Sequence, residues 1–255
     1  MSRYRLGVVA LVLLSAGCLG FEAGGATEQP SVSTRAPGIA NGSVDATALV
    51  AAHERSLDGV AVAVETTQSR WGTDVDNRTV DTRTLTDGNG TLWRRQLTQR
   101  DTTRTRVERW QQGGDSLRYV ADTGAVVATD GAATPGERYG TAALETWLAA
   151  GEYEVDAVES GGQTGYVLTS TTYTPPNGEA LEADTVRYEA AAVVTPAGRV
   201  TAMSATLVTV ETNRWGRHVR AQSYEYRVAR SGGVEPTRPE WVPERAAAAP
   251  EGGDG

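Results

Sequence analysis

The sequence predicts an α+β domain built mainly from antiparallel strands. From residue 60 onwards, apolar positions recur with a period of two in segment after segment, as they do in half-buried strands. Clusters of Gly, Asn, Asp and Pro separate these segments and supply the backbone conformations that tight hairpins need. Two stretches have the 3.6-residue period of a helix instead. The length of 255 residues suits one large domain of this class.

The N-terminus has the three parts of a secretory signal: two early arginines, an apolar run over residues 6–17, and small residues before Cys18. Leu14-Ser15-Ala16-Gly17-Cys18 resembles a prokaryotic lipobox, although Ser15 stands where such motifs favour leucine. The alternative is an uncleaved anchor, but this run is shorter than the roughly 20 apolar residues that cross a bilayer. We expect a cleaved signal peptide over residues 1–17, a lipid on Cys18, and attachment to the extracytoplasmic face of the cell membrane.

Composition divides the rest of the chain. Residues 18–42 are mostly Gly, Ala, Ser, Thr, Pro and Glu without periodic apolar positions, so we expect a flexible, lipid-anchored tether. A single folded domain is then predicted over residues 43–245, and the Ala- and Gly-rich residues 246–255 are expected to form a disordered tail. Because Cys18 is the single cysteine, no disulfide within the chain is possible.

The two helices have recognisable starts and stops. Ser43 is a suitable N-cap for a first helix that carries an apolar face as far as Leu57 and ends before Gly59. A second helix is predicted over Thr141 to Ala150, with Gly151 closing it. It interrupts a chain that otherwise has the pattern of strands.

The strands are expected at Val60 to Thr66, Arg78 to Thr86, Thr91 to Gln99, Arg104 to Gln111, Leu117 to Ala121, Val126 to Thr129, Tyr153 to Val158, Tyr166 to Tyr173, Thr185 to Thr195, Arg199 to Thr212 and Arg217 to Arg230. The last three have the clearest alternation and are joined by short turns, which predicts a three-stranded meander. A proline-rich arm follows them. We expect Trp241 to pin this arm to the domain.

Charge and composition exclude some partners. The formal charge is −8, and removing the two arginines of residues 1–17 leaves −10 on the mature chain. Nucleic acid and anionic lipid headgroups are therefore poor partners. All 24 basic residues are arginine, and acids are abundant, a composition that resembles secreted proteins of haloarchaea. GC-rich codon usage accounts for the missing lysine but not for the excess of acids.

No catalytic or metal-binding motif is present, so we expect neither enzyme activity nor a cofactor. His53 and His218 have no second His or Cys at metal-binding spacing and are expected to be ordinary helix and strand residues. The acids Glu152, Glu154, Asp156 and Glu159 leave a glycosidase open as a third hypothesis. In so acidic a chain, a solvated strand face is the stronger interpretation. Three Asn-x-Ser/Thr triplets, at Asn41, Asn77 and Asn89, are candidate glycosylation sites.

Taken together, the lipobox, the polar tether, the first helix leading into a strand, the long late hairpins and Pro239-Glu240-Trp241-Val242 resemble the LolA-like and LppX-like lipoproteins of haloarchaea. The resemblance covers nearly the whole chain and implies a strongly curved antiparallel sheet, a half-barrel, with two helices packed on its concave side. Relatives elsewhere hold acyl chains between sheet and helices. A similar cavity here is implied by the resemblance and not by residue spacing.

Six apolar residues are the candidate ligand-binding set: Leu144, Trp147 and Leu148 from the second helix, with Trp93, Trp110 and Tyr188 from the sheet. The first hypothesis is a membrane-anchored protein that binds or carries a hydrophobic, lipid-like ligand between these groups. The alternative is a structural, sensor or interaction module in which the same residues fill a solid core. An apolar cavity of roughly a few hundred cubic ångströms would distinguish the two.

Overall fold

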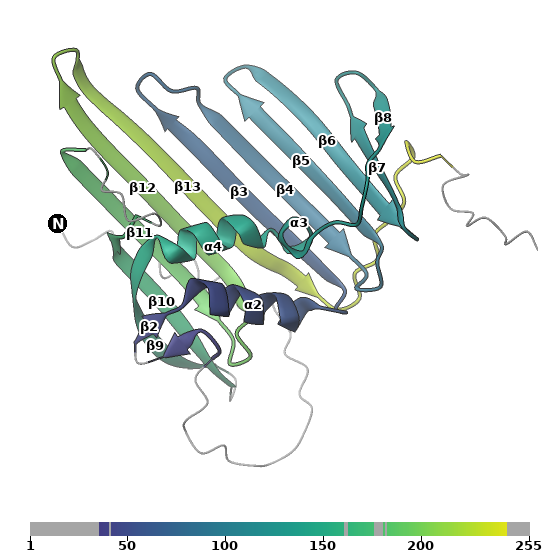
Figure 1. The fold of residues 1–255 in the computed structure, drawn as a ribbon, viewed down its shortest axis with the longest axis horizontal. Coiled ribbons are helices and arrows are strands. Elements are labelled where there is room, and N and C mark those ends of the chain that lie inside the picture. Colours follow the sequence, from purple (N-terminus) through teal and green to yellow (C-terminus); the bar gives the residue numbers. More distant parts are fainter. Residues whose placement is uncertain (1–35, 41, 161–162, 176–180, 182, 244–255) are drawn as a thin grey trace, which may run out of the picture.

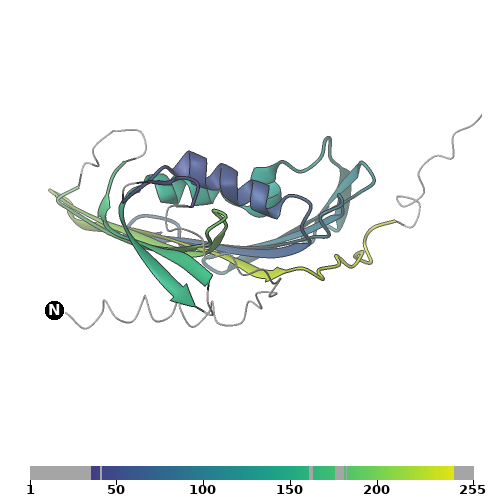
Figure 2. The same ribbon diagram turned by 90° about the horizontal axis from the view of Figure 1, so that it is seen from below.

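The computed structural model of the chain describes residues 36–40, 42–160, 163–175, 181 and 183–243. Within these residues, eleven strands form one antiparallel sheet and three helices pack on one of its faces (Figure 1). Seen along its edge, the sheet curves towards the helices and remains open rather than closing into a barrel (Figure 2). The predicted α+β class is confirmed, with one helix more than the two expected.

In spatial order the strands of the sheet are β8 (Ala125–Ala128), β7 (Asp115–Val120), β6 (Thr103–Gln112), β5 (Leu92–Arg100), β4 (Arg78–Thr86), β3 (Val62–Gly72), β13 (Gly216–Ser231), β12 (Val200–Asn213), β11 (Thr185–Val194), β10 (Gln163–Tyr173) and β9 (Gly151–Ser160). Each predicted strand is present, with ends shifted by a few residues. Two meanders, β3 to β8 and β9 to β13, are joined where the first strand pairs with the last, Val64 opposite Val228. This pairing makes one sheet from two local hairpin series.

The first helix, α2 (Ala46–Leu57), begins two residues later than predicted. Asp45 is its N-cap, because its carboxylate accepts a hydrogen bond from the Ala48 amide at 2.9 Å. The predicted N-cap, Ser43, lies instead in β2 (Ser43–Val44), and its hydroxyl donates to the carbonyl of Ala40 in the paired strand β1 (Ile39–Ala40). The prediction of Ser43 as N-cap is therefore wrong. An Asp two residues further on offers the same oxygen nearer the helix.

Two consecutive helices separate the meanders. The short α3 (Pro135–Tyr139) has a capping box between Thr134 and Glu137 and ends at Gly140, which adopts a left-handed φ of 68°. It was not predicted. The following α4 (Thr141–Ala149) matches the second predicted helix within one residue.

The folded part begins before residue 43. Ala36 and Ile39, both within the predicted tether, are buried in the main core at 1% and 4% exposure. Gly38 between them has a φ of 82°, and a Cβ there would lie 2.5 Å from the Leu49 amide nitrogen. The chain therefore needs glycine at this position to pass so close to α2. The signal segment, Cys18, Asn41 and the predicted tail over 246–255 lie outside the described residues.

Buried tyrosines connect the sheet to α4 and α3 to α2. Tyr188 on β11 and Tyr153 on β9 both donate to the Trp147 carbonyl in α4, at 2.9 and 3.1 Å. Tyr139 of α3 donates to the Leu57 carbonyl at the end of α2, at 3.1 Å. Burial raises the pKa of Tyr188 to about 12, so its hydroxyl remains a donor at neutral pH. The last carbonyls of α2 and α4 thus find their hydrogen-bond donors on neighbouring elements.

His53 is the polar centre of the α2 contact. It is fully buried, its Nδ1 accepts from the Val200 amide at 3.1 Å, and its Nε2 lies 2.7 Å from the Tyr226 hydroxyl. An amide can only donate, so Nδ1 carries no proton and Nε2–H donates to Tyr226. Burial, and to a smaller extent Arg199, lowers the pKa of His53 to about 3. The imidazole is neutral wherever the protein is folded near neutral pH.

We expect His53 to make the fold acid-sensitive. Its pKa is about 3 when folded and about 6.5 when unfolded, so the unfolded chain binds more protons between these values. The stabilisation is complete above pH 6.5 and is lost as the pH falls towards 3, at up to about 1.4 kcal/mol per pH unit. Denaturant unfolding measured from pH 7 to 4 should show this slope.

His53→Gln removes the titrating group and should flatten the slope, at a lower overall stability. Val50→Ala is the control, because Val50 is buried on the same helix and carries no titrating group, so the variant should be less stable at every pH while the slope is kept. Equal slopes in wild type and His53→Gln would contradict a neutral, buried His53.

Candidate functional site

The candidate ligand-binding set is divided between the two faces of the sheet. Trp93 and Trp110 are direct cross-strand partners in β5 and β6. Their neighbour Arg109 reaches Glu137 of α3, and Gln111 accepts from the Ala133 amide just before that helix. Because successive strand residues face opposite sides, Trp110 and Trp93 point away from the helices. They do not join the other four candidate residues.

The remaining candidates meet between helices and sheet, but they are packed solid. Leu144 and Leu148 of α4 are 0% and 1% exposed, and Tyr188 of β11 is 2% exposed. A side chain that lined a cavity wide enough for an acyl chain would keep far more accessible surface than this. The protein's own side chains therefore fill the place where a ligand was expected.

Trp147 is the exception, because it is only partly buried. Its indole lies parallel to the rings of Tyr188 and Tyr224, with centroids 6.4 and 6.1 Å away. Tyr173, also partly buried, contacts Tyr188 from another side at 5.7 Å. Trp147 and Tyr173 thus cover Tyr188 at the edge of the core, where an apolar molecule would first meet it.

On the face away from the helices, a second aromatic cluster forms around Glu108. This carboxylate is 7% exposed, and its Oε2 accepts hydrogen bonds from the indoles of both Trp93, at 3.2 Å, and Trp241, at 2.9 Å. Trp241 stacks on Tyr119 with centroids 5.4 Å apart. Arg106 supplies the countercharge, 3.4 Å from Glu108 Oε1. The prediction that Trp241 pins the C-terminal arm is confirmed, and Glu108 is the residue that holds it.

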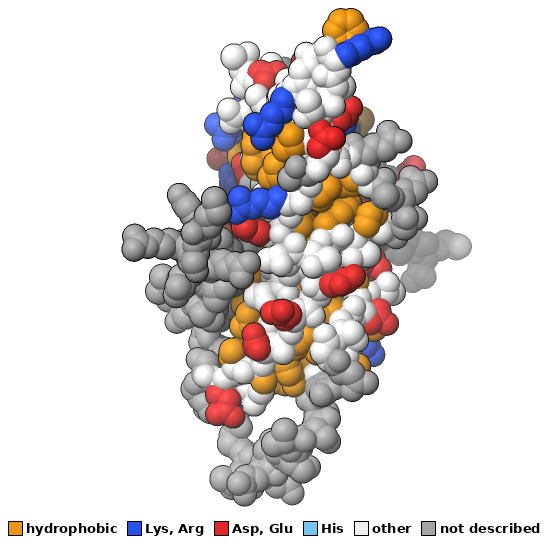
Figure 3. All heavy atoms as spheres, turned by 90° about the vertical axis from the view of Figure 1, so that its left-hand side faces the viewer, with side chains coloured by type: hydrophobic (Ala, Val, Ile, Leu, Met, Phe, Trp, Pro, Cys, Tyr) orange, Lys and Arg blue, Asp and Glu red, His pale blue; other side chains and the backbone are white. Residues whose placement is uncertain are grey.

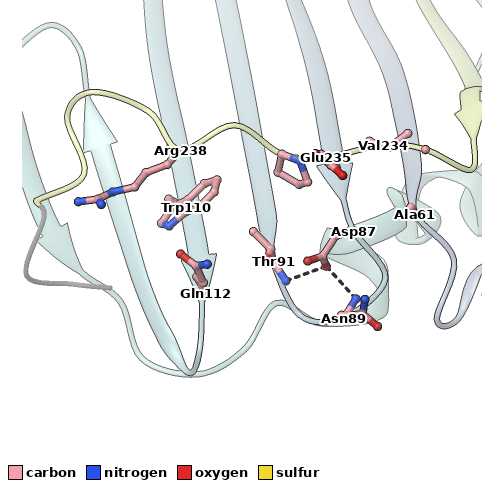
Figure 4. A pocket seen from close by; sticks show the side chains of 11 residues that line it. Ala61, Asp87, Asn89, Thr91, Trp110, Gln112, Val234, Glu235 and Arg238 are labelled. Atoms are coloured by element: carbon pink, nitrogen blue, oxygen red, sulfur yellow. Dashed lines mark hydrogen bonds between the residues drawn. The ribbon is translucent and has the colours of Figure 1, made fainter. Parts of the chain in front are cut away.

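The arm crosses the ends of several strands on its way to this cluster and leaves a groove of about 660 Å³ beside it (Figure 4). Glu235 and Arg238 come from the arm, Trp110 and Gln112 from β6, and the β4–β5 turn supplies the remaining polar wall, which includes Asp87, Asn89 and Thr91. Trp110, a ligand candidate, and Asn89, a glycosylation candidate, therefore line the same groove. Its walls mix charged and aromatic groups, unlike the apolar lining expected of an acyl-chain site.

Asp87 gives the groove a fixed negative charge. Partial burial raises the pKa of this carboxyl, but hydrogen bonds from Thr91 and the Asn89 amide outweigh it, so the pKa lies below its usual range. Asn89 is exposed at the tip of the turn, and Asn77 is exposed before β4. Both sequons are sterically accessible, and their glycosylation remains a prediction.

The other groups considered from sequence are dispersed. Glu152, Glu154, Asp156 and Glu159 are all exposed on the edge strand β9, and Figure 3 shows acidic side chains scattered over this side of the molecule. They form no carboxylate pair across a cleft, so this arrangement does not support a glycosidase. The described residues contain no cluster of His, Cys, Asp or Glu that could hold a metal ion. Among them, too, no helix has the length and apolar character needed to cross a membrane.

No protein-family model and no curated protein matches this sequence. Among solved structures, LprF from Mycobacterium bovis is similar over 78% of this chain and 97% of its own, with 11% identity and a TM-score of 0.35. A DUF1329 family protein from Desulfovibrio piger is 12% identical over 72% and 92% of the two chains, with a TM-score of 0.23. A LolA superfamily protein from Nitrosomonas europaea is 11% identical over 71% and 91%, with a TM-score of 0.23. Likenesses this distant assign neither a family nor a function to the chain.

We expect Glu108→Gln to loosen the C-terminal arm. The amide cannot keep both the Arg106 ion pair and two indole donors, and charge-assisted hydrogen bonds of this kind are worth about 1.5–3 kcal/mol. Unfolding free energy should fall by about 2 kcal/mol, and limited proteolysis should cleave the arm sooner than in wild type.

Glu65→Gln is the control, because Glu65 lies on the same face and pairs with Arg83 and Arg227, but its side chain is 31% exposed. A half-exposed pair should contribute less than about 1 kcal/mol. If Glu108→Gln costs no more than Glu65→Gln, Glu108 does not anchor the arm.

Proposed function

We propose that this chain is a binding module held at the extracytoplasmic face of the cell membrane by a lipid on Cys18, and that it makes its contacts through exposed surface. The lipobox-like segment and the signal before it support the anchoring. One observation carries the mode of binding: Leu144, Leu148 and Tyr188, the core of the expected ligand site, keep at most 2% of their surface exposed. An interior filled in this way favours an interaction module over a carrier with an internal cavity.

A second candidate function, carriage of a hydrophobic lipid-like ligand, is favoured by Trp147 and Tyr173. Both are only partly buried, and both cover Tyr188. A ligand would enter by displacing their rings and opening the core between α4 and β11. Because Trp147 is only partly buried, moving its indole aside would break fewer core contacts than moving a fully buried one.

Trp147→Ala separates these two functions. If the core is solid, the variant should lose about 3 kcal/mol of unfolding free energy, near the lower end for a buried Trp→Ala change, and wild type should take up no fluorescent fatty acid. Denaturant unfolding and fluorescence titration provide the measurements. Saturable uptake by wild type that Trp147→Ala abolishes with little loss of stability would instead establish the carrier.

Trp215→Ala is the matched control for this experiment. Trp215 lies in the β12–β13 turn and is 77% exposed, so its removal should alter neither stability nor probe uptake. Comparing Trp147→Ala with Trp215→Ala therefore separates the role of Trp147 from any general effect of deleting an indole.

Anchoring is tested by Cys18→Ser. Lipid attachment contributes roughly 0.8 kcal/mol per buried CH₂ and requires the cysteine sulfur. We expect the serine variant to leave the membrane fraction while its circular dichroism spectrum stays unchanged, because Cys18 lies outside the described core, whose N-terminal members are Ala36 and Ile39. Persistent membrane association of the variant in high salt would contradict a lipid anchor.

A further inference from the structure

Three arginines lie side by side on the helix face of the sheet. Arg94 of β5 is directly opposite Arg109 of β6, and Arg109 is directly opposite Arg118 of β7. Direct cross-strand partners have Cα atoms about 4.5–5.5 Å apart, and like charges in that position destabilise a sheet. We call Arg94, Arg109 and Arg118 the arginine row. In a chain with a net charge of −8, such a row calls for a physical reason.

On the opposite face of the sheet, the arginine charges are neutralised by neighbouring carboxylates. There the cross-strand order is Arg227, Glu65, Arg83, Arg95 and Glu108, so Arg83 and Arg95 are neighbours, but each arginine has a carboxylate directly opposite it on one side. Glu65 forms ion pairs with both Arg83 and Arg227. The strands therefore accommodate arginine with carboxylate partners on one face, whereas no strand carboxylate enters the arginine row on the other.

Arg109 is fixed within the row. Its Nε donates to the Ser116 hydroxyl at 2.9 Å, its Nη1 to Glu137 of α3 at 3.2 Å, and its Nη2 to the Gly131 carbonyl at 3.0 Å. With a side chain 16% exposed, it is a rigid, partly neutralised centre. Arg94 and Arg118 flank this centre on the two sides.

Arg94 is half-buried, and its Nε is enclosed without a hydrogen-bond partner. Burial lowers the pKa of Arg94; Glu137 opposes this shift and Arg109 adds to it. Arg118 is exposed, so the row remains open to solvent at that end. A guanidinium group with an enclosed, unpartnered Nε is costly. An anion at the open side of the row would meet the other nitrogens of the guanidinium groups, and its charge would offset part of that cost.

A similar row, Arg70, Arg78 and Arg100, lies further along β3, β4 and β5. It is near the hairpin ends, and the groove that Arg70 and Arg78 line also includes Asp101. That row also has an enclosed unpartnered donor, Arg78 Nε, and exposed ends, but a carboxylate lies beside it. The row beside α3 differs in having a central arginine that is fixed by hydrogen bonds to Ser116, Glu137 and Gly131.

We propose that the arginine row binds an oxyanion, a phosphate or sulfate group, between Arg94 and Arg118 with Arg109 as the fixed centre. Guanidinium groups present planar pairs of donors that match the oxygens of such anions. The negative charge of the remaining surface disfavours both long polyanions such as nucleic acid and anionic membrane surfaces, so a small ester or ion is the expected ligand, and a lipid headgroup is the other source of the same phosphate chemistry that the experiment must distinguish. The inference rests on the proposed function, since it names the chemistry that one exposed surface recognises.

The experiment titrates the full chain carrying Cys18→Ser, so that a lipid on Cys18 does not contribute, with sodium phosphate and with sodium sulfate at constant ionic strength set by NaCl. Arginine Nε–Hε NMR resonances are the readout. We expect saturable shifts at Arg94 and Arg118, and at least about tenfold weaker binding in Arg94→Gln/Arg118→Gln, since one charge-assisted hydrogen bond is worth about this factor. Should the double variant fail to fold, Arg118→Gln alone serves, because Arg118 is exposed.

Arg83→Gln/Arg227→Gln is the control: it removes the same charge from the other face and should bind phosphate like wild type.

A second experiment compares vesicles of phosphatidylglycerol with vesicles of phosphatidylcholine. Shifts at the row with the anionic vesicles alone identify a headgroup as the source, and shifts with free phosphate or sulfate identify a soluble ligand. No shift with any probe, or equal losses in the two double variants, overturns the proposal. Fatty-acid uptake by the core would count against the proposed function and leave this result unaffected.

Discussion

The structure depends on the hydrogen bonds between buried tyrosines and the helix layer. Tyrosine is an efficient residue for this interface, because its ring contributes apolar burial while its hydroxyl reaches a backbone carbonyl. Tyr188 and Tyr153 converge on the Trp147 carbonyl, and Tyr139 satisfies Leu57 at the end of α2. Each contact pairs a buried donor with a carbonyl that has no partner within its own helix. Sliding α4 along the sheet would break the hydrogen bonds of Tyr188 and Tyr153 to Trp147, and shifting α2 against α3 would leave the buried Tyr139 hydroxyl without its acceptor, Leu57.

The close packing of the helices on the sheet also determines which surfaces of the protein can bind a partner. Beneath α2 and α4, small residues such as Ala190, Ala192 and Ala205 lie among the tyrosines and let the helices approach closely. The interface is filled as a result, and its buried polar groups, such as His53, are hydrogen-bonded within it. On the face away from the helices, Glu108 gathers Trp93 and Trp241 and fastens the C-terminal arm. On the helix face, the arginine row beside α3 is left with Glu137 as its carboxylate partner.

Local sequence patterns predicted the elements well. Strands such as β4, β12 and β13 combine strict alternation with turn residues at their ends, and both signals depend on neighbouring residues alone. The errors arose where two local signals competed or a segment was short. Ser43 and Asp45 both suit an N-cap, and the register of β1 with β2 decided between them. The five residues of α3 are too few for helical periodicity, although its capping box was legible in the sequence.

By itself, the sequence determined the class of fold, the order of its elements and the alternation of faces within each strand. It could not determine which face of a strand lies under the helices, because alternation fixes only that neighbouring residues point in opposite directions. Trp93 and Trp110 were assigned to the inner face for this reason, and the cross-strand register places them outside. Register decided the arginine row as well, since Arg94, Arg109 and Arg118 lie on three consecutive strands, and a slip of one residue would turn any of them to the other face. The pairing of β3 with β13, which brings Val64 opposite Val228, is a long-range contact that only the tertiary structure makes.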